Sequence, residues 1–461
     1  MKKIGFIFIV VFFLSLILVT QLQSINSPLK NNDEGIYLTT FLLINSNHSA
    51  YKETFLSQPP GFLLSVYPGF ILFGKSLQAA RLTIGLWSLI GLLAIVWICL
   101  ELKNPLAAIL TLGILYLIPY YFNQTLIFQS DALAIAFSLI SLAFLLRFFN
   151  TKSFKWFIVS AIFVNLVFWT KFDFFLIPSL ITISLFLIKD RQLTRSKMFI
   201  LTGIFIVVTV IFYLFLIAPF GIQYVFNNTV GLRLAAASLQ TPPLVFFTYI
   251  GQDALFFLLI IVTGIFIAVR KESFRFPLLP IFVWVCTIFI FLTFYKPLYS
   301  HHMIIFVVPV VLFFSLSVTF WLKKYPSFYS FIIFCILLIA AFNYVSIIPK
   351  KSSGILTPDQ QKAVEVINKY TYQKDIVVTD EEILNGVTGR LPPAQLSDVS
   401  FVRIFSNNLS PEKFKQIINT TKPKLIIPWN GRLWSIRGFN SILSGYRPLT
   451  TINNKTIYFR D

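Results

Sequence analysis

Long apolar runs recur along almost the whole of this 461-residue chain, and they constrain its fold more than any other feature. A helix needs about 20 apolar residues to cross the hydrocarbon core of a bilayer. Eleven runs of about that length are present, at residues 4–22, 83–101, 105–121, 131–149, 156–170, 173–188, 198–218, 244–269, 277–294, 303–322 and 327–347. The pattern predicts an α-helical polytopic membrane protein with about 11 transmembrane helices.

Two stretches are less regular than the rest. At "WTKFDFF", Lys171 and Asp173 divide one long apolar stretch into two short runs. A further run at 60–74 is shorter than a span and follows Pro59-Pro60. We predict an interfacial or re-entrant helix there.

The overall charge balance is explained by the membrane topology. The chain is 57% hydrophobic and only 12% charged, whereas a soluble domain carries about 25% charged residues. Its formal charge of +20 would suit nucleic acid, but cytoplasmic loops of membrane proteins collect Lys and Arg and account for it without that partner. The three cysteines all lie inside apolar runs, which favours small core residues over metal ligands or a disulfide.

The positions of Lys and Arg predict the orientation. With the N-terminus inside, the short inner loops hold fifteen cations and the longer outer loops hold seven. The positive-inside rule therefore predicts a cytoplasmic N-terminus and an extracytoplasmic C-terminus in a multi-pass cell-membrane protein. The first run lacks a small-residue cleavage site at Thr20–Ser24, so we expect a retained anchor instead of a cleaved signal peptide.

The long apolar runs end near residue 350, and the sequence after it is a mixture of polar and apolar residues. We predict a transmembrane catalytic domain over 1–349, with a first outer loop at 23–82, and an extracytoplasmic α/β domain over 350–461. In the second part, "TPDQQKAVEVINKY" and "SPEKFKQIINT" have helix-start signals, "DIVVT" and "KLIIP" are typical of strands, and "YRPLTTINNKTIYF" predicts a terminal hairpin.

Ionisable residues of the membrane part gather near one predicted side. The acidic residues at outer loops or outer helix ends are Asp33, Glu34, Glu53, Asp131, Asp173 and Asp253. The cations and histidines at that level are Arg81, Lys171, Arg233, Lys296, His301 and His302. Ionisable groups at membrane depth are costly and usually face a cavity or one another. The pattern therefore favours a polar cavity that opens to the outer surface.

Such a cavity suits a lipid-linked phosphate. The lipid chain would lie against apolar helices while Lys and Arg meet the phosphate. A carboxylate near an acceptor hydroxyl can take its proton as the hydroxyl attacks. If the lipid carries a phospho-sugar, the phosphate is already a good leaving group once cations neutralise it.

Several of these residues also have purely structural explanations. Asp33 and Glu34 on their own are typical of two solvated acids after a helix. Arg81 could be a residue that snorkels at a helix start, and Asp253 could be a buried, hydrogen-bonded acid.

Other candidates are open to the same interpretation. Lys171 with Asp173 could only cap the turn between two short helices. His301 and His302 could be ordinary interfacial residues.

The order of three motifs is more specific. "DEGIY" (33–37), "QPPGFLL" (58–64) and "LFGKSLQAARL" (72–82) follow one another in one outer loop. This loop resembles that of the GT-C glycosyltransferases, in the branch of the protein O-mannosyltransferases and aminoarabinose transferases (glycosyltransferase family 39). "IFQSDALAIAF", "TKFDFFLIP", "GRLPPAQLSD" and "IIPWNGRLW" extend the resemblance over nearly the whole chain.

The resemblance implies roles for particular residues. Asp33 would be the catalytic base, and Glu34 would support it or position the acceptor. Asp131 falls at the family's second acidic position and Lys171 at a donor-phosphate position. Gln58 stands where relatives often carry Lys, which removes a fixed charge.

The remaining outer-level groups complete the expected substrate site. Arg81, Arg233 or Lys296 would replace the missing charge near the phosphate, and His301 and His302 belong to the same substrate-binding set. No metal ligand is assigned. A divalent metal is nevertheless left open, because some GT-C enzymes use one.

The expected function is an inverting transfer of a hexosyl or pentosyl group. The donor would be a sugar on dolichyl or undecaprenyl phosphate, and the acceptor a protein, lipid or glycan outside the cytoplasm. Two alternatives remain, namely a transporter or flippase of lipid-linked saccharides and a non-catalytic binder of them. A transporter predicts polar residues across the bilayer midplane, whereas here they gather at one end.

Overall fold

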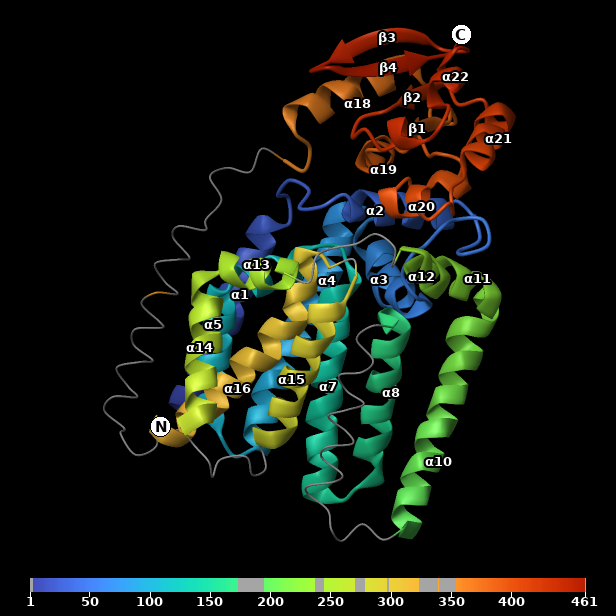
Figure 1. Cartoon of the computed structure of the whole chain (residues 1–461). Coiled ribbons are helices and arrows are strands. Elements are labelled where there is room, and N and C mark those ends of the chain that lie inside the picture. The colour runs from blue at the N-terminus through green and yellow to red at the C-terminus, as the bar shows by residue number, and fades with distance from the viewer. Residues whose placement is uncertain are drawn as a thin grey trace. The chain divides into compact units, whose positions relative to one another are not determined.

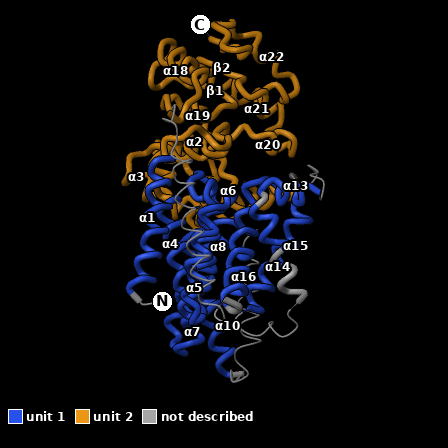
Figure 2. Tube along the Cα trace, turned by 90° about the vertical axis from the view of Figure 1, so that its left-hand side faces the viewer, with its two compact units in different colours: residues 1–24, 84–216, 241–350 blue, residues 25–83, 217–240, 351–461 orange. Residues whose placement is uncertain are grey.

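The computed structural model describes residues 3–172, 195–236, 244–269, 278–296, 298–322, 339 and 354–460. These residues are mostly helical (Figure 1). The chain divides into two compact units (Figure 2). Unit 1 comprises residues 1–24, 84–216 and 241–350, and unit 2 comprises residues 25–83, 217–240 and 351–461.

Unit 1 consists of apolar helices. Its elements are α1 (Lys3–Ser24), most of α4 (Leu77–Glu101), α5 (Pro105–Leu117), α6 (Pro119–Phe122), η1 (Gln124–Leu126), α7 (Ser130–Thr151), α8 (Phe154–Thr170), α10 (Arg195–Phe212), α13 (Leu244–Gln252), α14 (Ala254–Val269), α15 (Leu278–Phe294), η6 (Ser300–Met303) and α16 (Ile304–Leu322). Exposed apolar side chains such as Phe199 and Phe215 lie on α10 and on the π-helical turn after it (Tyr213–Ile217), as expected of a lipid-facing helix.

Five of the described helices are long and apolar enough to cross a membrane, and up to seven do so if two bent pairs each form one span. The protein is therefore a multi-pass membrane protein. One bent pair is α5 with the segment 119–126, which turns by 81° where Pro119 follows the helix. The predicted span at 173–188 and nearly all of the span at 327–347 lie outside the described residues, so the count of eleven stays a prediction.

Small residues allow close helix packing in unit 1. A Cβ atom added to Gly91 on α4 would lie 3.0 Å from the Cα of Ala136 on α7. Between α7 and α8, the Ser141 and Ser160 hydroxyls lie 3.1 Å apart, and each also donates to the other residue's carbonyl. Such small and polar contacts are the usual means of helix association in lipid.

Unit 2 combines loop helices with the C-terminal elements. From the first part of the chain it takes α2 (Asp33–Asn45), α3 (Pro60–Phe73), η4 (Ala218–Phe220), α11 (Ile222–Phe226), η5 (Asn227–Gly231) and α12 (Leu232–Ala236). From the C-terminal part it takes α18 (Pro358–Tyr370), β1 (Val377–Thr379), α19 (Glu382–Thr388), η7 (Ala394–Leu396), α20 (Phe401–Phe405), α21 (Pro411–Thr421), β2 (Leu425–Ile427), η8 (Leu433–Ser435), α22 (Phe439–Leu443), β3 (Arg447–Ile452) and β4 (Lys455–Phe459).

The C-terminal elements confirm the local sequence predictions. Thr357 and Gln360 form a capping box at the start of α18, and Ser410 caps α21. The sheet has the order β1-β2-β4-β3, with β1 and β2 parallel and the other pairs antiparallel. Asn453 and Asn454 both adopt positive φ, as the two-residue turn between β3 and β4 requires.

The first outer loop packs against these C-terminal elements within unit 2. A Cβ atom on Gly35 of α2 would lie 2.7 Å from the backbone nitrogen of Ile383, and one on Gly386 of α19 would lie 2.5 Å from the Leu38 side chain. The Thr39 hydroxyl donates to the Glu382 carbonyl at 2.7 Å. The structure thus adds residues 25–83 and 217–240 to the compact unit that holds the predicted domain at 350–461.

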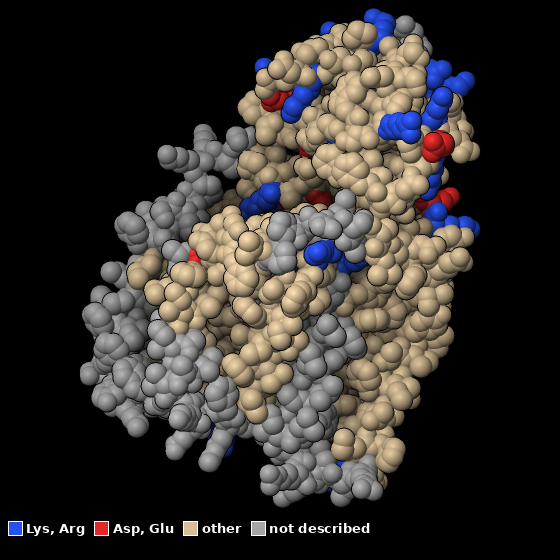
Figure 3. Space-filling view, in the orientation of Figure 1, with Lys and Arg blue, Asp and Glu red and all other residues tan. Residues whose placement is uncertain are grey.

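Charge is distributed unevenly over the described surface. On the face drawn in Figure 3, many Lys and Arg side chains lie on the surface of the C-terminal elements, while the described surface of the apolar helices is almost uncharged. This contrast agrees with apolar helices in lipid and an α/β part in water.

Candidate active site

Asp33 is the first residue of α2, the helix that carries the "DEGIY" motif. Its side chain is half-buried, and the next backbone N–H, that of Glu34, donates to the Asn31 Oδ1 atom at 3.2 Å. A carboxylate in the first turn is stabilised by the helix dipole. Asp33 is therefore a carboxylate at a helix start with access to solvent, as a base that meets an incoming acceptor requires.

Tyr37 lies one helical turn after Asp33 on the same face of α2. Its hydroxyl accepts a hydrogen bond from Gln58 Nε2 at 2.8 Å. The backbone carbonyl of Gln58 accepts another from the Tyr51 hydroxyl at 2.7 Å. Burial, with the nearby Asp33 charge, raises the pKa of Tyr37 well above its ordinary value. Tyr37 is thus a neutral hydroxyl beside the candidate base. The sequence analysis missed it, although its spacing from Asp33 was visible.

Glu34 forms an ion pair with Arg81. The Arg81 Nε and Nη2 atoms donate to the two carboxylate oxygens at 2.8 and 2.7 Å. The Arg81 side chain is 1% exposed and that of Glu34 is 0% exposed. The pair joins the start of α2 to the start of α4, which are far apart in the sequence but lie within unit 2.

The other Arg81 nitrogens hold the loop that precedes α2. Nη1 donates to the carbonyls of Ile25 and Ser27 at 3.0 and 2.7 Å, and Nη2 donates to that of Pro28 at 3.3 Å. A guanidinium has five N–H groups, and these bonds occupy all five. Arg81 is thus arranged to position the "DEGIY" segment. Gln58 also contacts this segment, because its side chain donates a hydrogen bond to the Tyr37 hydroxyl. The sequence analysis had placed both in the donor-phosphate or substrate site, with Arg81 as one possible replacement for the charge that Gln58 lacks.

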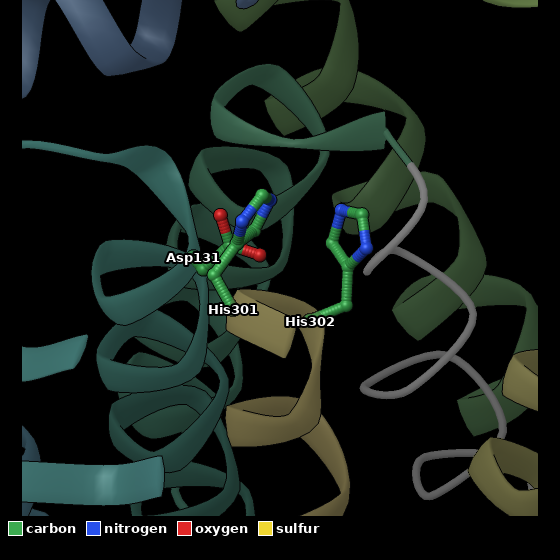
Figure 4. A group of neighbouring side chains, drawn as sticks. All are labelled: Asp131, His301 and His302. Atoms are coloured by element: carbon green, nitrogen blue, oxygen red, sulfur yellow. The ribbon is translucent and has the colours of Figure 1, made fainter. Parts of the chain in front are cut away.

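A second group of candidate residues lies in unit 1. The Lys171 ammonium is 2.6 Å from Asp131 Oδ1, and both side chains are at most 3% exposed. Asp131 lies in the first turn of α7, and Lys171 follows the end of α8. His301 and His302 complete the group, with ring centroids 4.3 Å apart, and Figure 4 shows the His301 ring beside the Asp131 carboxylate.

The second group has the residue types of a metal centre. Asp131, His301 and His302 each offer a donor atom, and these atoms lie within 4.8 Å of one another. However, His302 Nδ1 accepts the backbone N–H of Tyr299 at 3.1 Å, so in the neutral ring Nε2 carries the proton and no lone pair remains for a metal. Lys171 already occupies one oxygen of Asp131. The arrangement fits a hydrogen-bonded, ion-paired cluster and does not fit a metal ion.

The two other predicted cations occupy more open positions. Arg233 lies on α12 in unit 2 and is half-buried. Lys296 follows α15 in unit 1 and is exposed. The structure therefore brings together Asp33, Glu34, Gln58 and Arg81 through shared contacts in unit 2. It separately brings together Asp131, Lys171, His301 and His302 in unit 1.

The "IIPWNGRLW" motif has a structural partner in the acidic run after β1. Asp380 accepts backbone N–H groups from Trp429, Asn430 and Leu433, and Glu382 pairs with Arg432 at 2.6 Å. Glu382 is also the first residue of α19, the helix that packs on α2. The motif thus supports the helix that carries Asp33.

Two of three comparisons with known proteins found matches, and these two point to the same kind of protein. The structure matches ArnT from Cupriavidus metallidurans bound to undecaprenyl phosphate with a TM-score of 0.71, at 13% identity, over 99% of this chain and 98% of that one. It matches the oligosaccharyltransferase AglB from Archaeoglobus fulgidus, in complex with an inhibitory peptide and a dolichol-phosphate, with a TM-score of 0.56 at 12% identity, over 98% of this chain and 74% of that one. Among curated protein sequences none matches significantly.

These matches and the membrane helices define a multi-pass membrane protein with the GT-C fold. Residues 57–217 match the dolichyl-phosphate-mannose-protein mannosyltransferase family. The chain therefore shares the fold of ArnT and AglB, and its residues 57–217 are similar to the protein mannosyltransferases that the loop motifs indicated.

Proposed function

We propose that this protein transfers a sugar from a polyprenyl-phosphate carrier to an acceptor on the outer face of the membrane, with inversion at the anomeric carbon. The observation that carries the proposal is the constellation around Asp33. A half-buried carboxylate at a helix start lies beside a neutral Tyr37, in a segment fixed by the buried Glu34–Arg81 pair. The ArnT match adds support, because that protein was captured with undecaprenyl phosphate.

Each group receives one role. The acceptor hydroxyl attacks the anomeric carbon, the bond from that carbon to the phosphate oxygen breaks, and polyprenyl phosphate leaves. Asp33 takes the proton of the attacking hydroxyl. Lys171, held by Asp131, is assigned to the phosphate, where its positive charge would stabilise the leaving group.

Glu34 and Arg81 act indirectly in this proposal. All five N–H groups of Arg81 are used within unit 2, so its role is to hold the loop and α2. His301 and His302 are assigned to the donor side together with Lys171, because they lie around the same Asp131 carboxylate. The cytoplasmic N-terminus and outer C-terminus remain part of the proposal.

The test uses the purified full chain in proteoliposomes that contain a polyprenyl-phosphate sugar labelled in the sugar. An enzyme of the proposed kind releases polyprenyl phosphate and moves the label to an acceptor added outside. A flippase instead changes which leaflet holds the intact lipid and releases none. Translocation of intact lipid without cleavage, under any acceptor condition, would overturn the proposal.

A further inference from the structure

A polar cavity of about 500 Å³ lies in unit 1, and its described lining includes none of Asp131, Lys171, His301 and His302. Its polar lining comes from Tyr120 on α6, from Asn123 and Gln124 after it, from Gln252 and Asp253 between α13 and α14, and from Ser300 at the start of η6. The volume is within the range of small-molecule sites, about 300–1,000 Å³. None of the residues that were given a role in sugar transfer lines this cavity.

Two buried oxygen atoms at the cavity wall lack hydrogen-bond partners among the described residues. They are Gln124 Oε1 and Asp253 Oδ2, and both side chains are 9% exposed. Asp253 Oδ1, in contrast, accepts the Phe256 N–H at 3.0 Å and caps α14. Buried acceptors without partners are rare because they are costly, and they point to a ligand that donates hydrogen bonds.

The break between α13 and α14 explains how Asp253 reaches the cavity. The sequence suggests one continuous run at 244–269, with Asp253 inside it. The structure ends α13 at Gln252 and begins α14 at Ala254, so the carboxylate lies at a helix junction. One oxygen satisfies the helix end and the other remains for a ligand.

The chemistry of the lining favours a hydroxylated ligand. Among the described residues that line the cavity there is no Lys, Arg or His, and Asp253 would repel a phosphate. Amide, hydroxyl and carboxylate groups instead suit several O–H donors on one small molecule. The Tyr120 ring, with Leu117 and Pro119, supplies an apolar wall.

We propose that this cavity binds the sugar ring of the lipid-linked donor, with Asp253 and Gln124 accepting hydrogen bonds from its hydroxyl groups; this inference rests on the proposed function. Ser300 lies next to the side chains proposed to bind the donor phosphate, because the residues that follow it in η6 are His301 and His302. A site built to bond hydroxyl groups rejects ligands that lack them, since its buried polar groups are then left unpaired. The cavity would therefore set sugar specificity.

Two variants separate this role from a structural one. Asp253→Asn keeps an oxygen to cap α14 but replaces the second oxygen with an N–H donor. Gln124→Met removes an acceptor with little change of size and touches no helix cap. Glu101→Gln is the matched control, because Glu101 is an acid of unit 1 whose partners are Trp97, Arg147 and Asn150 and which does not line the cavity.

The experiment measures binding of purified full-length protein to sugar-free polyprenyl phosphate and to polyprenyl-phosphate mannose, glucose, galactose and arabinose. Wild type should prefer one glycosylated lipid. Asp253→Asn and Gln124→Met should each bind that lipid about 10- to 100-fold more weakly, with binding of the sugar-free lipid unchanged. The control should match wild type for both lipids.

The outcomes distinguish this inference from the function on which it rests. If wild type binds the lipids but prefers no sugar, or if both variants retain full preference, the sugar site is wrong while the proposed function stands. If wild type binds none of the lipids, both the proposed function and this inference are wrong. Should Asp253→Asn fail to fold, Gln124→Met alone decides.

Discussion

Removing the charge of Glu34 should lower the stability of the protein and also slow sugar transfer. In Glu34→Gln the Arg81 guanidinium stays buried with its charge unneutralised, since Arg81 is only 1% exposed. Breaking a buried ion pair by removing one partner costs roughly 3–5 kcal/mol. At about 2–4 °C per kcal/mol for a unit of this size, the melting temperature should fall by roughly 6–20 °C.

Arg81→Lys tests the geometry of the same pair. Lysine keeps the charge but offers three N–H donors from one atom, so it cannot bridge both Glu34 oxygens and three loop carbonyls together. We expect a loss of stability comparable to that of Glu34→Gln. If Arg81 served only as a charge for the donor phosphate, lysine would substitute for it.

The assay is the intrinsic tryptophan melting curve of the detergent-purified protein, with sugar transfer measured on the same samples. The control is Glu101→Gln, whose partner Arg147 is 42% exposed, so the loss should be at most about 1 kcal/mol. A Glu34→Gln protein that melts like wild type but has lost transfer would refute the positioning role. It would indicate that Glu34 takes part in the chemistry.

Three further outcomes follow from the packing and the charges. Gly35→Ala should lower the melting temperature, because its Cβ would lie 2.7 Å from the Ile383 nitrogen, while Gly203→Ala, with nothing within 4 Å, should not; equal melting of the two would refute tight packing of α2 on α19. Lys171→Met should weaken binding of sugar-free polyprenyl phosphate by roughly 10-fold or more, measured by lipid titration, and unchanged binding would remove Lys171 from the phosphate site. Treatment with EDTA should leave transfer unchanged, and loss of activity restored by zinc would contradict the metal-free cluster.

The fold could be predicted from the sequence where local signals suffice. The apolar runs mark helices such as α1, α4 and α7, and the caps at Thr357 and Ser410 mark the starts of α18 and α21. The order of the loop motifs indicated the family whose model matches residues 57–217, and the structural match to ArnT has the fold that these motifs predicted. These features depend on neighbours within a few residues or on an ordered pattern, both visible in one sequence.

The partners within the site could not be predicted in this way. Glu34 and Arg81 lie 47 positions apart, and only the folded loop shows that Arg81 is fully used by its contacts. The break before α14 was hidden because apolar runs continue on both sides of the short segment Gly251–Asp253. Packing of α2 on α19 joins residues more than 300 positions apart, which no local pattern encodes.

Asp33→Asn tests the central claim most directly. The change keeps the size of the side chain and removes its ability to accept a proton at neutral pH. With purified protein and a polyprenyl-phosphate sugar, the rate of transfer should fall by about 10²–10⁴-fold, while the melting curve and the binding of the lipid stay close to wild type. Near-wild-type transfer by this variant would contradict the assignment of Asp33 as the catalytic base.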